Sequence, residues 1–413
     1  MNNAINNENK KLNVPNLRFK EFQGEWEKTK FGDIATGFDY GMNAAAKNYD
    51  GVNKYIRITD IDEASSTYTD KDIVSPDGVL TDNYLVNNRD ILLARTGAST
   101  GKSYLYKKSD GKLYYAGFLI RANVTTHDPY FVFSQLHTHR YWRWVSIMSA
   151  RSGQPGINSQ EYSSFPIYTT SIEEESKIAN LLSLLDERIA TQSKIIDSLQ
   201  TLIKGIADNI LDNPLLEKTY LSSFMQFFST NSLSWEQLSY EDGKIRNLHY
   251  GLIHSFQTSG INSASLPMVK YGAIPKQYTL CQVGDVAFAD ASEDTNEIGK
   301  SVEFVDTIDV DTICGLHTIH GRDVKNKTLI GFKGFAFNSR YFHNQIKRLA
   351  QGTKVFSITA NNLSSCYVYL PDLETQKAIV NLLKTYEAKL LVSKRLLEHY
   401  EKQKQYLLCQ MFI

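Results

Sequence analysis

Two long stretches of the chain carry an apolar residue every three or four positions, with polar residues between them. The first stretch runs from Ser171 to Asp212, and the second covers residues 372–413. This spacing is typical of a helix that buries one stripe in the seam of a coiled coil. The predicted seam comprises Leu182, Leu185, Ile189, Ile196, Leu199 and Ile203 in the first stretch, and Leu383, Tyr386, Leu390, Leu397 and Tyr400 in the second.

Polar residues indicate where each predicted helix begins and how the two would align. Ser171 followed by Glu174 is a capping-box pattern, and Asp372 is a favourable N-cap for the second helix. Gln192 and Ser393 place a polar side chain at the same position of each seam. Because a polar residue inside an apolar seam favours one register, we expect these two positions to align the helix pair.

The chain is an internal repeat. Residues 164–212 align with residues 365–413 at a constant offset of 201. Upstream, the string Gly-Lys-Ser recurs at residues 101–103 and 299–301, an offset of 198. Offsets that drift before the helices and stay constant within them indicate two copies of one unit, a globular domain followed by a long helix.

The charge of the two helices favours their packing on each other. Residues 166–213 carry 4 basic and 8 acidic side chains, a net charge of −4, whereas residues 372–413 carry 7 basic and 5 acidic, a net charge of +2. The alternative is two unrelated helices, each packed on its own domain. The matching phase of the two patterns over their whole length argues against it.

Short aromatic and β-branched runs predict strands in the globular parts at residues 54–61, 113–124 and 301–310, and helices over Pro129–Ala150 and Phe337–Ala350. The predicted fold class is α+β: two small mixed α/β domains in a pseudo-two-fold repeat, joined by two long helices that form an antiparallel coiled coil. The predicted boundaries are 1–168 for the N-terminal segment and first globular domain, 169–213 for the first helix, 214–370 for the second globular domain and 371–413 for the second helix.

Composition narrows the class of protein. A length of 413 residues exceeds a single core, and 42% apolar residues exclude a wholly disordered chain. Lys plus Arg and Asp plus Glu are both 45, so the zero net charge argues against a polybasic nucleic-acid binder but leaves local basic faces open. The sequence shows no signal peptide and no membrane-spanning run, and its four cysteines are widely spaced, which predicts a cytoplasmic protein without a zinc ribbon or disulfide framework.

Motifs for catalysis are weak. Residues 97–103 look like a phosphate loop but hold three residues between the glycines where a nucleotide-binding loop needs four. The sequence lacks the Asn/Asp-Pro-Pro-aromatic string with which amino-methylating enzymes hold the amine to be methylated. The nine histidines show no metal-ligand spacing. We therefore expect neither a catalytic site nor a metal site.

The remaining polar features suit recognition of DNA. They cluster on the strand at residues 54–60, on a Gly-rich turn (residues 95–103) and on a Gln-Pro-Gly turn (residues 151–158), with analogous positions in the second domain. Arg and Gln can read base edges with two hydrogen bonds. The candidate contacts are Lys54, Arg57, Arg95, Ser99, Thr100, Lys102, Arg151, Gln154 and Asn158 in the first domain, and His249, Tyr250, Lys300 and Lys354 in the second. For any one of them an ordinary surface position fits as well, so the interpretation depends on the set and its repetition.

Several strings of the sequence resemble those of a known family. The opening NVPNLRF (residues 13–19) with Phe22-x-Gly24-x-Trp26, the strings IRITDI, ARTGASTGKS and GQPGIN, and LPDLExQK (residues 370–377) are similar to specificity subunits of type I restriction-modification systems. The resemblance covers essentially the whole chain and includes the order of the parts. Two departures exist: the first helix starts TTSIEEESK without the Pro and Gln of that pattern, and the second domain lacks the Gly-Gln-x-x-Ile-Asn string.

The resemblance implies a non-catalytic subunit that reads double-stranded DNA. Each globular domain would recognise one half of a split, asymmetric site, and the helix pair would set the unread spacer. The chain would bind two methyltransferase subunits, and restriction (translocase) subunits for cleavage. It would hold no cofactor itself, since S-adenosylmethionine, ATP and magnesium would be used by the partners. The competing interpretations are a protein-interaction scaffold without DNA and, third, a fused methyltransferase or nuclease.

Overall fold

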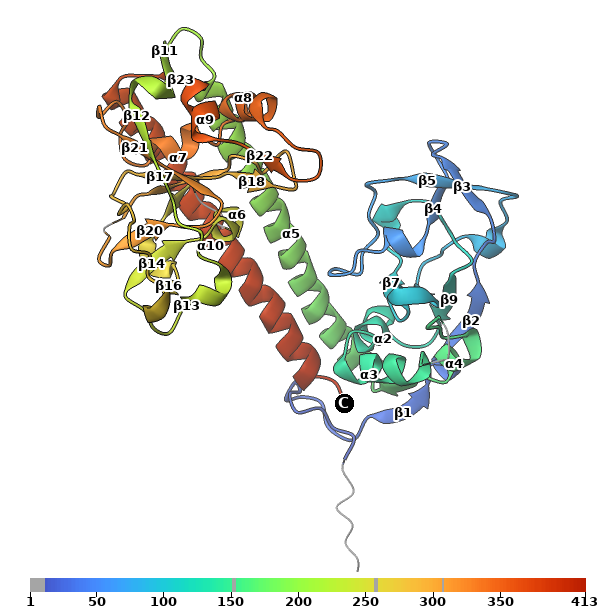
Figure 1. The fold of residues 1–413 in the computed structure, drawn as a ribbon. Coiled ribbons are helices and arrows are strands. Elements are labelled where there is room, and N and C mark those ends of the chain that lie inside the picture. Colours follow the sequence, from blue (N-terminus) through green and yellow to red (C-terminus); the bar gives the residue numbers. More distant parts are fainter. Residues whose placement is uncertain (1–11, 151–153, 256–258, 307) are drawn as a thin grey trace, which may run out of the picture. The chain divides into compact units, whose positions relative to one another are not determined.

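A computed structural model describes residues 12–150, 154–255, 259–306 and 308–413. By residue contacts the chain divides into two units, Met1–Thr191 with Leu396–Ile413 (unit 1) and Gln192–Arg395 (unit 2). Each unit contains one globular domain and part of each of two long helices, α5 (Ile172–Leu211) and α10 (Leu373–Gln410) (Figure 1).

The domain of unit 1 is built on a four-stranded antiparallel sheet of order β2-β9-β6-β7, with the small pairs β1-β10, β3-β5 and β4-β8 around it. Its elements are β1 (Glu27–Lys30), α1 (Phe31–Ile34), β2 (Ala35–Tyr40), β3 (Ala45–Asn48), β4 (Lys54–Ile56), β5 (Val74–Asp77), β6 (Asp90–Ala94), β7 (Ser103–Leu105), β8 (Leu113–Tyr115), β9 (Leu119–Val124), α2 (Pro129–Gln135), α3 (His139–Met148), α4 (Ser159–Ser163) and β10 (Pro166–Thr169).

The domain of unit 2 repeats this plan. Its main sheet has the order β12-β21-β17-β19-β15, which matches β2-β9-β6-β7 with one added strand, and the parallel pair β14-β20 matches β4-β8. The conserved topology confirms the duplication predicted from sequence. Its elements are β11 (Glu217–Tyr220), β12 (Met225–Phe228), β13 (Leu238–Ser239), β14 (Ile245–Leu248), α6 (Tyr250–Ser255), β15 (Gly260–Ile261), β16 (Met268–Val269), β17 (Val286–Ala289), β18 (Ala291–Ser292), β19 (Ser301–Phe304), β20 (Thr312–Cys314), β21 (Thr318–Asp323), α7 (Phe332–Ala336), α8 (Arg340–Leu349), β22 (Phe356–Ser357), α9 (Ala360–Ser365) and β23 (Tyr367–Leu370).

Strand β6 shows why the sheet is central in unit 1. All five of its residues are buried, because one face packs Ile91 and Leu93 into the core with the helices while the other face packs Leu92 and Ala94 into a second core. A strand covered on both faces reads as a continuous apolar run, and each fully buried large aliphatic side chain contributes about 1.5–3 kcal/mol.

All three predicted strands are shorter in the structure. The run predicted at 301–310 forms β19, which ends at Phe304. Strand β4 ends at Ile56, because the Asp60 carboxylate accepts a hydrogen bond from the backbone N–H of Arg57 and bends the next residues into a single 3-10 turn. The run at 113–124 forms two strands, β8 and β9, separated by a tight turn in which Leu119 N–H donates to the Ala116 carbonyl. The prediction of uninterrupted strands was wrong at both places because local hydrogen bonds compete with the ladder.

Of the two helices predicted in the globular domains, the first is divided and the second starts later than predicted. Residues 129–150 form α2 and α3, because the Thr138 hydroxyl caps α3 by accepting from Tyr141 N–H (3.4 Å). In unit 2, Ser339 caps α8 in the same way, with Phe342 N–H at 3.3 Å, so the helix starts at Arg340 rather than Phe337.

The long helices α5 and α10 pack together in antiparallel fashion, as the predicted fold class requires. In unit 1 the first half of α5 shares a core with the end of α10, and in unit 2 the second half of α5 shares a core with the start of α10. Every residue of the predicted seam is buried or half-buried. No helix among the described residues has the length and apolar content to cross a bilayer.

Polar contacts fix how the two helices align. The Gln192 side-chain amide donates to the backbone carbonyl of Ser393 at 3.1 Å, so the two polar seam positions do meet, but through the Ser393 backbone. In unit 1, Lys404 Nζ lies 2.7 Å from an Asp186 oxygen, an ion pair that uses the opposite charges of the helices. A buried amide that must be satisfied disfavours a shifted register.

The start of α10 is capped as expected, because Asp372 Oδ1 accepts from Thr375 N–H at 2.9 Å. The start of α5 forms only half of the predicted capping box. Ser171 Oγ accepts from Glu174 N–H at 3.3 Å, but the Glu174 carboxylate turns away to Arg18 and Thr170.

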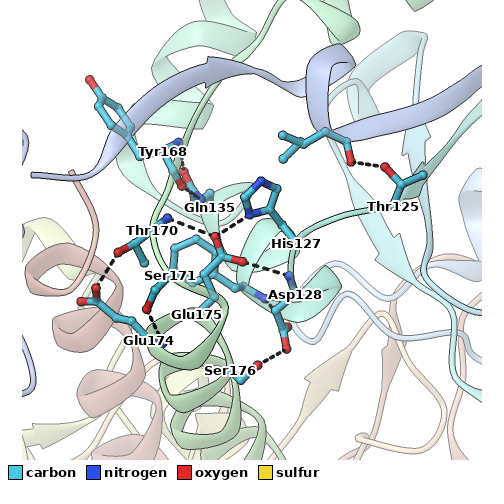
Figure 2. Close-up of polar contacts among 12 residues, drawn as sticks. Thr125, His127, Asp128, Gln135, Tyr168, Thr170, Ser171, Glu174, Glu175 and Ser176 are labelled. Carbon is cyan, nitrogen blue, oxygen red and sulfur yellow. Dashed lines mark hydrogen bonds and ion pairs between the residues drawn. The ribbon is translucent and has the colours of Figure 1, made fainter. Parts of the chain in front are cut away.

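The neighbouring residue Glu175 fastens the start of α5 to the globular domain (Figure 2). Its buried carboxylate accepts from the backbone N–H groups of Asp128 (3.0 Å) and Thr170 (3.1 Å), and it lies 2.8 Å from His127 Nδ1. The equivalent residue in unit 2, Gln376, accepts from a backbone N–H through its Oε1 and donates to backbone carbonyls. Both copies therefore use position 4 of the long helix to orient the helix on its domain, one with a carboxylate and the other with an amide.

Candidate nucleic-acid interface

The Gly-rich turn and the Gln-Pro-Gly turn of unit 1 lie side by side. Gly97 N–H donates to the Pro155 carbonyl at 3.0 Å, and Ile157 N–H donates to the Arg95 carbonyl at 2.9 Å. Residues 96 and 156 form an isolated antiparallel bridge. The fold thus joins two predicted recognition turns, separated by more than 50 residues in the chain, into one surface element.

Arg95 is the centre of this element. Its guanidinium lies over the ring of Tyr40 (4.9 Å to the centroid) and beside that of Phe118 (6.0 Å), and both rings are exposed. Gln154 is exposed and lies next to the turn. A Cβ built on Gly97 would come within 3.3 Å of the Gln154 amide nitrogen. A cation held between exposed aromatic rings, with an amide beside it, suits contact with bases and phosphates.

Two buried tyrosines hold the base of the element. Tyr162 OH donates to the Ala94 carbonyl at 2.6 Å, and Tyr141 OH donates to the Gly101 carbonyl at 2.8 Å. Gly101 has φ +95°, and a Cβ there would meet Val145 at 2.8 Å, so only glycine fits. The turn is therefore presented by a rigid core.

The candidates on the first strand have partners inside the domain. Lys54 Nζ donates to the Asp110 carbonyl at 2.8 Å. Arg57 makes two hydrogen bonds to Asp60 (2.9 and 2.8 Å) and reaches Asp72. These contacts give both side chains a structural role.

Thr100 and Asn158 also have local roles. Thr100 is buried, and its hydroxyl donates to the Gly97 carbonyl at 2.7 Å. Asn158 is the N-cap of α4, where its side chain accepts from Glu161 N–H at 2.9 Å. Both side chains bond to the backbone of the element and stabilise its turns.

The other candidates of the first domain differ in exposure. Lys102 Nζ lies 3.3 Å from an exposed Glu63 carboxylate, an ion pair that solvent screens. Ser99 is half-buried at the end of the single 3-10 turn Gly97–Ser99. Arg151 lies outside the described residues.

Unit 2 contains the same backbone arrangement with different side chains. Asp290 N–H donates to the His317 carbonyl at 3.1 Å, as Arg95 N–H does to the Phe118 carbonyl at 3.1 Å. Ile358 N–H donates to the Asp290 carbonyl, matching the bond from Ile157 to Arg95. A carboxylate thus replaces the guanidinium and an imidazole replaces the phenyl ring, with His317 Nδ1 3.1 Å from Asp290 Oδ1.

An aromatic group lies beside this second element. His249 is buried and packs at a tilt against Trp235 (4.5 Å between ring centroids) and Tyr250 (4.7 Å), and its Nδ1 accepts from Gly251 N–H. The ring of Tyr250 meets His317 edge-on at 5.4 Å. His249 therefore supports the exposed Trp235 and the half-buried Tyr250.

The two candidate lysines of unit 2 differ. Lys300 Nζ donates to the His254 carbonyl and to Glu297, both at 3.1 Å, whereas Lys354 is exposed in the turn before β22. Sequence reasoning missed Tyr40, Phe118, Asp290 and His317, although the repeat offsets could have paired Arg95 with Asp290 and Phe118 with His317.

Comparisons with known proteins agree with this fold. The family model described as "Type I restriction modification DNA specificity domain" matches residues 23–201 and 266–401, so the chain belongs to that family. It is 23% identical over 414 residues to the type I restriction enzyme MjaVIII specificity subunit of Methanocaldococcus jannaschii, covering 94% of this chain and 93% of that protein. A putative type I restriction enzyme MjaX specificity subunit of the same organism is 23% identical over 411 residues, with 96% and 95% covered.

Solved structures share the fold. The S subunit of a type I restriction-modification system from M. genitalium matches with a TM-score of 0.59 at 14% identity, covering 97% of this chain and 99% of that one. A chain from a structure on complex assembly and conformational transition of the type I R-M system matches with a TM-score of 0.55 at 14% identity, with 95% and 97% covered. These structures confirm the predicted fold, and the family model confirms the family predicted from sequence.

Proposed function

We propose that this chain is the DNA-reading specificity subunit of a type I restriction-modification complex, and that each globular domain reads one half of a bipartite, asymmetric site on double-stranded DNA. The observation that carries the proposal is the duplicated surface element, which has Arg95 and Phe118 in unit 1 but Asp290 and His317 in unit 2. A guanidinium suits guanine, and a carboxylate accepts from cytosine N4. One scaffold with opposite charges at the same place accounts for two different half-sites.

The helix pair would set the unread spacer and dock the partner subunits. Helix α5 is 40 residues long, about 60 Å at ~1.5 Å per residue. Large apolar side chains outside the seam support docking, since isolated exposed residues are common but recurrent ones along two helices are not. They are Leu184, Ile195 and Leu202 on α5, and Leu391, Val392 and Tyr406 on α10. We assign two methyltransferase subunits to these helices, with restriction subunits joining for cleavage in the cytoplasm.

We propose no catalytic role for the chain itself. S-adenosylmethionine, ATP and magnesium would bind to the partner subunits. The purified chain is expected to show no methylation or cleavage of DNA when given all three, and activity is expected to return when the methyltransferase and restriction subunits are added. Turnover by the chain alone, at a rate proportional to its concentration, would reject the non-catalytic assignment.

The DNA-reading role is tested by binding of the methyltransferase complex to a mixture of duplexes over a range of salt concentrations. Phosphate contacts make affinity fall steeply with salt, so a strong salt slope with selection of a split sequence is expected. A scaffold that does not bind DNA would give no shift at any salt concentration.

Replacing Arg95 by alanine is expected to weaken binding to the selected site by about 1–3 kcal/mol, roughly fivefold to 150-fold, with relaxed specificity in one half-site. The matched control is Lys108→Ala, which removes an exposed cation of the same domain away from the element. Fluorescence anisotropy and methylation mapping give both readouts. Equal losses in the two variants would show that Arg95 contributes only general charge.

A further inference from the structure

Two thiols and an imidazole meet in the interior of unit 2. Cys281, Cys314 on β20 and His320 on β21 each offer a ligand atom, and these atoms all lie within 4.8 Å of one another. The two sulfur atoms are 3.5 Å apart, and all three side chains are buried. The sequence spacing of 33 and 6 residues matches no metal motif, which is why the sequence did not indicate the cluster.

The backbone places the cluster where two sheets of unit 2 come together. Cys281 N–H donates to the Thr312 carbonyl at 2.8 Å, which ties the segment before β17 to β20. Strand β20 belongs to the sheet β13-β16-β14-β20, whereas β21 belongs to the main sheet. A ligand shared by these residues would therefore join the two sheets.

The surroundings of His320 direct one ring nitrogen toward a ligand. His320 Nε2 lies 2.7 Å from Asp285 Oδ2, and Arg322 donates to both Asp285 oxygens at 2.8 and 2.7 Å. Because Arg322 donates to both oxygens of Asp285, Oδ2 serves as the acceptor for His320 Nε2–H, and Nδ1 is the ring nitrogen left to face a ligand. A carboxylate on the distal nitrogen is the usual support of a metal-binding histidine.

The charges of the cluster balance with a divalent ion. Asp285 is already compensated by Arg322, so the pair is neutral. Two thiolates would add two negative charges to a buried site, a cost that a divalent cation removes. The sulfur spacing also fits, because Zn–S bonds of about 2.3 Å at the tetrahedral angle put two sulfurs roughly 3.8 Å apart.

Unit 1 shows that the fold does not need these donors. Val86 N–H donates to the Leu113 carbonyl at 2.8 Å, so Val86 occupies the place of Cys281. By the same offset of 199 that relates Leu113 to Thr312, Tyr115 replaces Cys314 and Arg121 replaces His320. There the space is filled by apolar packing and by Arg121 lying 5.3 Å from the centroid of the Tyr115 ring. The donors in unit 2 are thus an addition to a core that the fold can build without them.

We propose that Cys281, Cys314 and His320 bind one Zn²⁺ ion that joins the two sheets of the second recognition domain. Binding releases the two thiol protons, and both sulfurs coordinate as thiolates with His320 Nδ1 as the third ligand. Three protein ligands leave one position of a tetrahedral ion for a fourth donor. The ion is structural: it would stabilise the domain that carries Asp290 and His317 and take no part in chemistry on DNA.

Metal analysis of the full chain, purified with its partner subunits and without chelators, tests the proposal. Elemental mass spectrometry is expected to find about one zinc per chain, and thiol titration of the denatured protein is expected to find four free thiols. Replacement of zinc by Co²⁺ is expected to give a thiolate-to-cobalt charge-transfer absorption. Zinc far below one per chain, or a disulfide between Cys281 and Cys314 in freshly purified protein, would overturn the proposal.

Matched variants locate the ion. Cys281→Val, which installs the residue that unit 1 uses, and Cys314→Ala are each expected to lose the zinc. The control Cys366→Ala removes another buried cysteine of unit 2 and is expected to keep it. If a variant does not fold, the native chain stripped of metal supplies the measurement: its unfolding midpoint is expected to fall and to recover with Zn²⁺ but not Mg²⁺. Zinc retained in both ligand variants, or a midpoint that zinc does not move, would contradict the assignment.

Discussion

A four-residue insertion in α5 between Ile195 and Leu202 is expected to lengthen the unread spacer of the DNA site by about two base pairs, without changing either half-site. Four residues add about 6 Å to a helix, and DNA rises roughly 3.4 Å per base pair. Four residues also complete slightly more than one helical turn. The seam residues after the insertion therefore still face α10. The helix becomes longer while each domain keeps its own contacts.

A two-residue insertion at the same place is the matched control. It turns the second half of α5 by about 200°, which moves the seam residues out of contact with α10. This variant is expected to lose site-specific methylation altogether. Base-resolved mapping of methylated adenines in cells that carry each variant reports spacer and half-sites in one measurement. New half-site bases at an unchanged spacer after the four-residue insertion would show that the helix pair does not set the spacing.

The long helices could be predicted from sequence because their information is local. The spacing through Leu182, Leu185 and Ile189 has one period, and its copy at an offset of 201 doubles the signal. Even the partnership of positions 192 and 393 was predictable, since equivalent positions of two antiparallel repeats meet at their axis. The pattern did not predict that Gln192 would donate to the backbone carbonyl of Ser393 rather than to its side chain.

The surface elements could be predicted only in part. Arg95 and Gln154 were identified by residue type, but their common site depends on backbone hydrogen bonds that join residues 97 and 155. Tyr40 at the end of β2 and Phe118 in the turn before β9 flank Arg95, and nothing local distinguishes them from the other aromatics of the chain. Lys54 and Arg57 were also chosen by residue type, but in the structure Lys54 donates to the backbone carbonyl of Asp110 and Arg57 donates to the Asp60 carboxylate, partners that residue type alone does not reveal.

Replacing Arg18 by alanine is expected to destabilise the junction of α5 with unit 1 by about 2–4 kcal/mol. Its guanidinium donates to both oxygens of Glu174 at 2.7 Å, and the Glu174 side chain is almost fully buried. Without Arg18 that carboxylate would keep only the hydroxyl of Thr170 as a side-chain donor, at 2.6 Å. The cost therefore comes mainly from a buried charge that has lost its partner.

Arg18 also gives a structural role to the N-terminal string NVPNLRF (residues 13–19), which is part of the family resemblance. Arg18 also donates to the carbonyls of Gln23 and Gly24, and Leu17 N–H donates to the Gln410 carbonyl at the end of α10. The segment thus links the start of one long helix to the end of the other within unit 1. Loss of Arg18 is expected to increase hydrogen exchange at both helix ends and to leave the helix ends in unit 2 unchanged.

The chain provides an exposed ion pair as the control. Lys177 pairs with Glu21 at the surface, one turn along α5 from Glu174, and solvent screens this pair. Lys177→Ala is expected to leave exchange at the helix ends almost unchanged, whereas the double variant Arg18→Ala with Glu174→Gln should recover part of the lost stability because no charge stays buried. Equal effects of Arg18→Ala and Lys177→Ala would mean that the N-terminal string acts through general charge, and the link between the two helix ends would then have to come from the apolar contacts of Trp26 with Phe131 and Phe412.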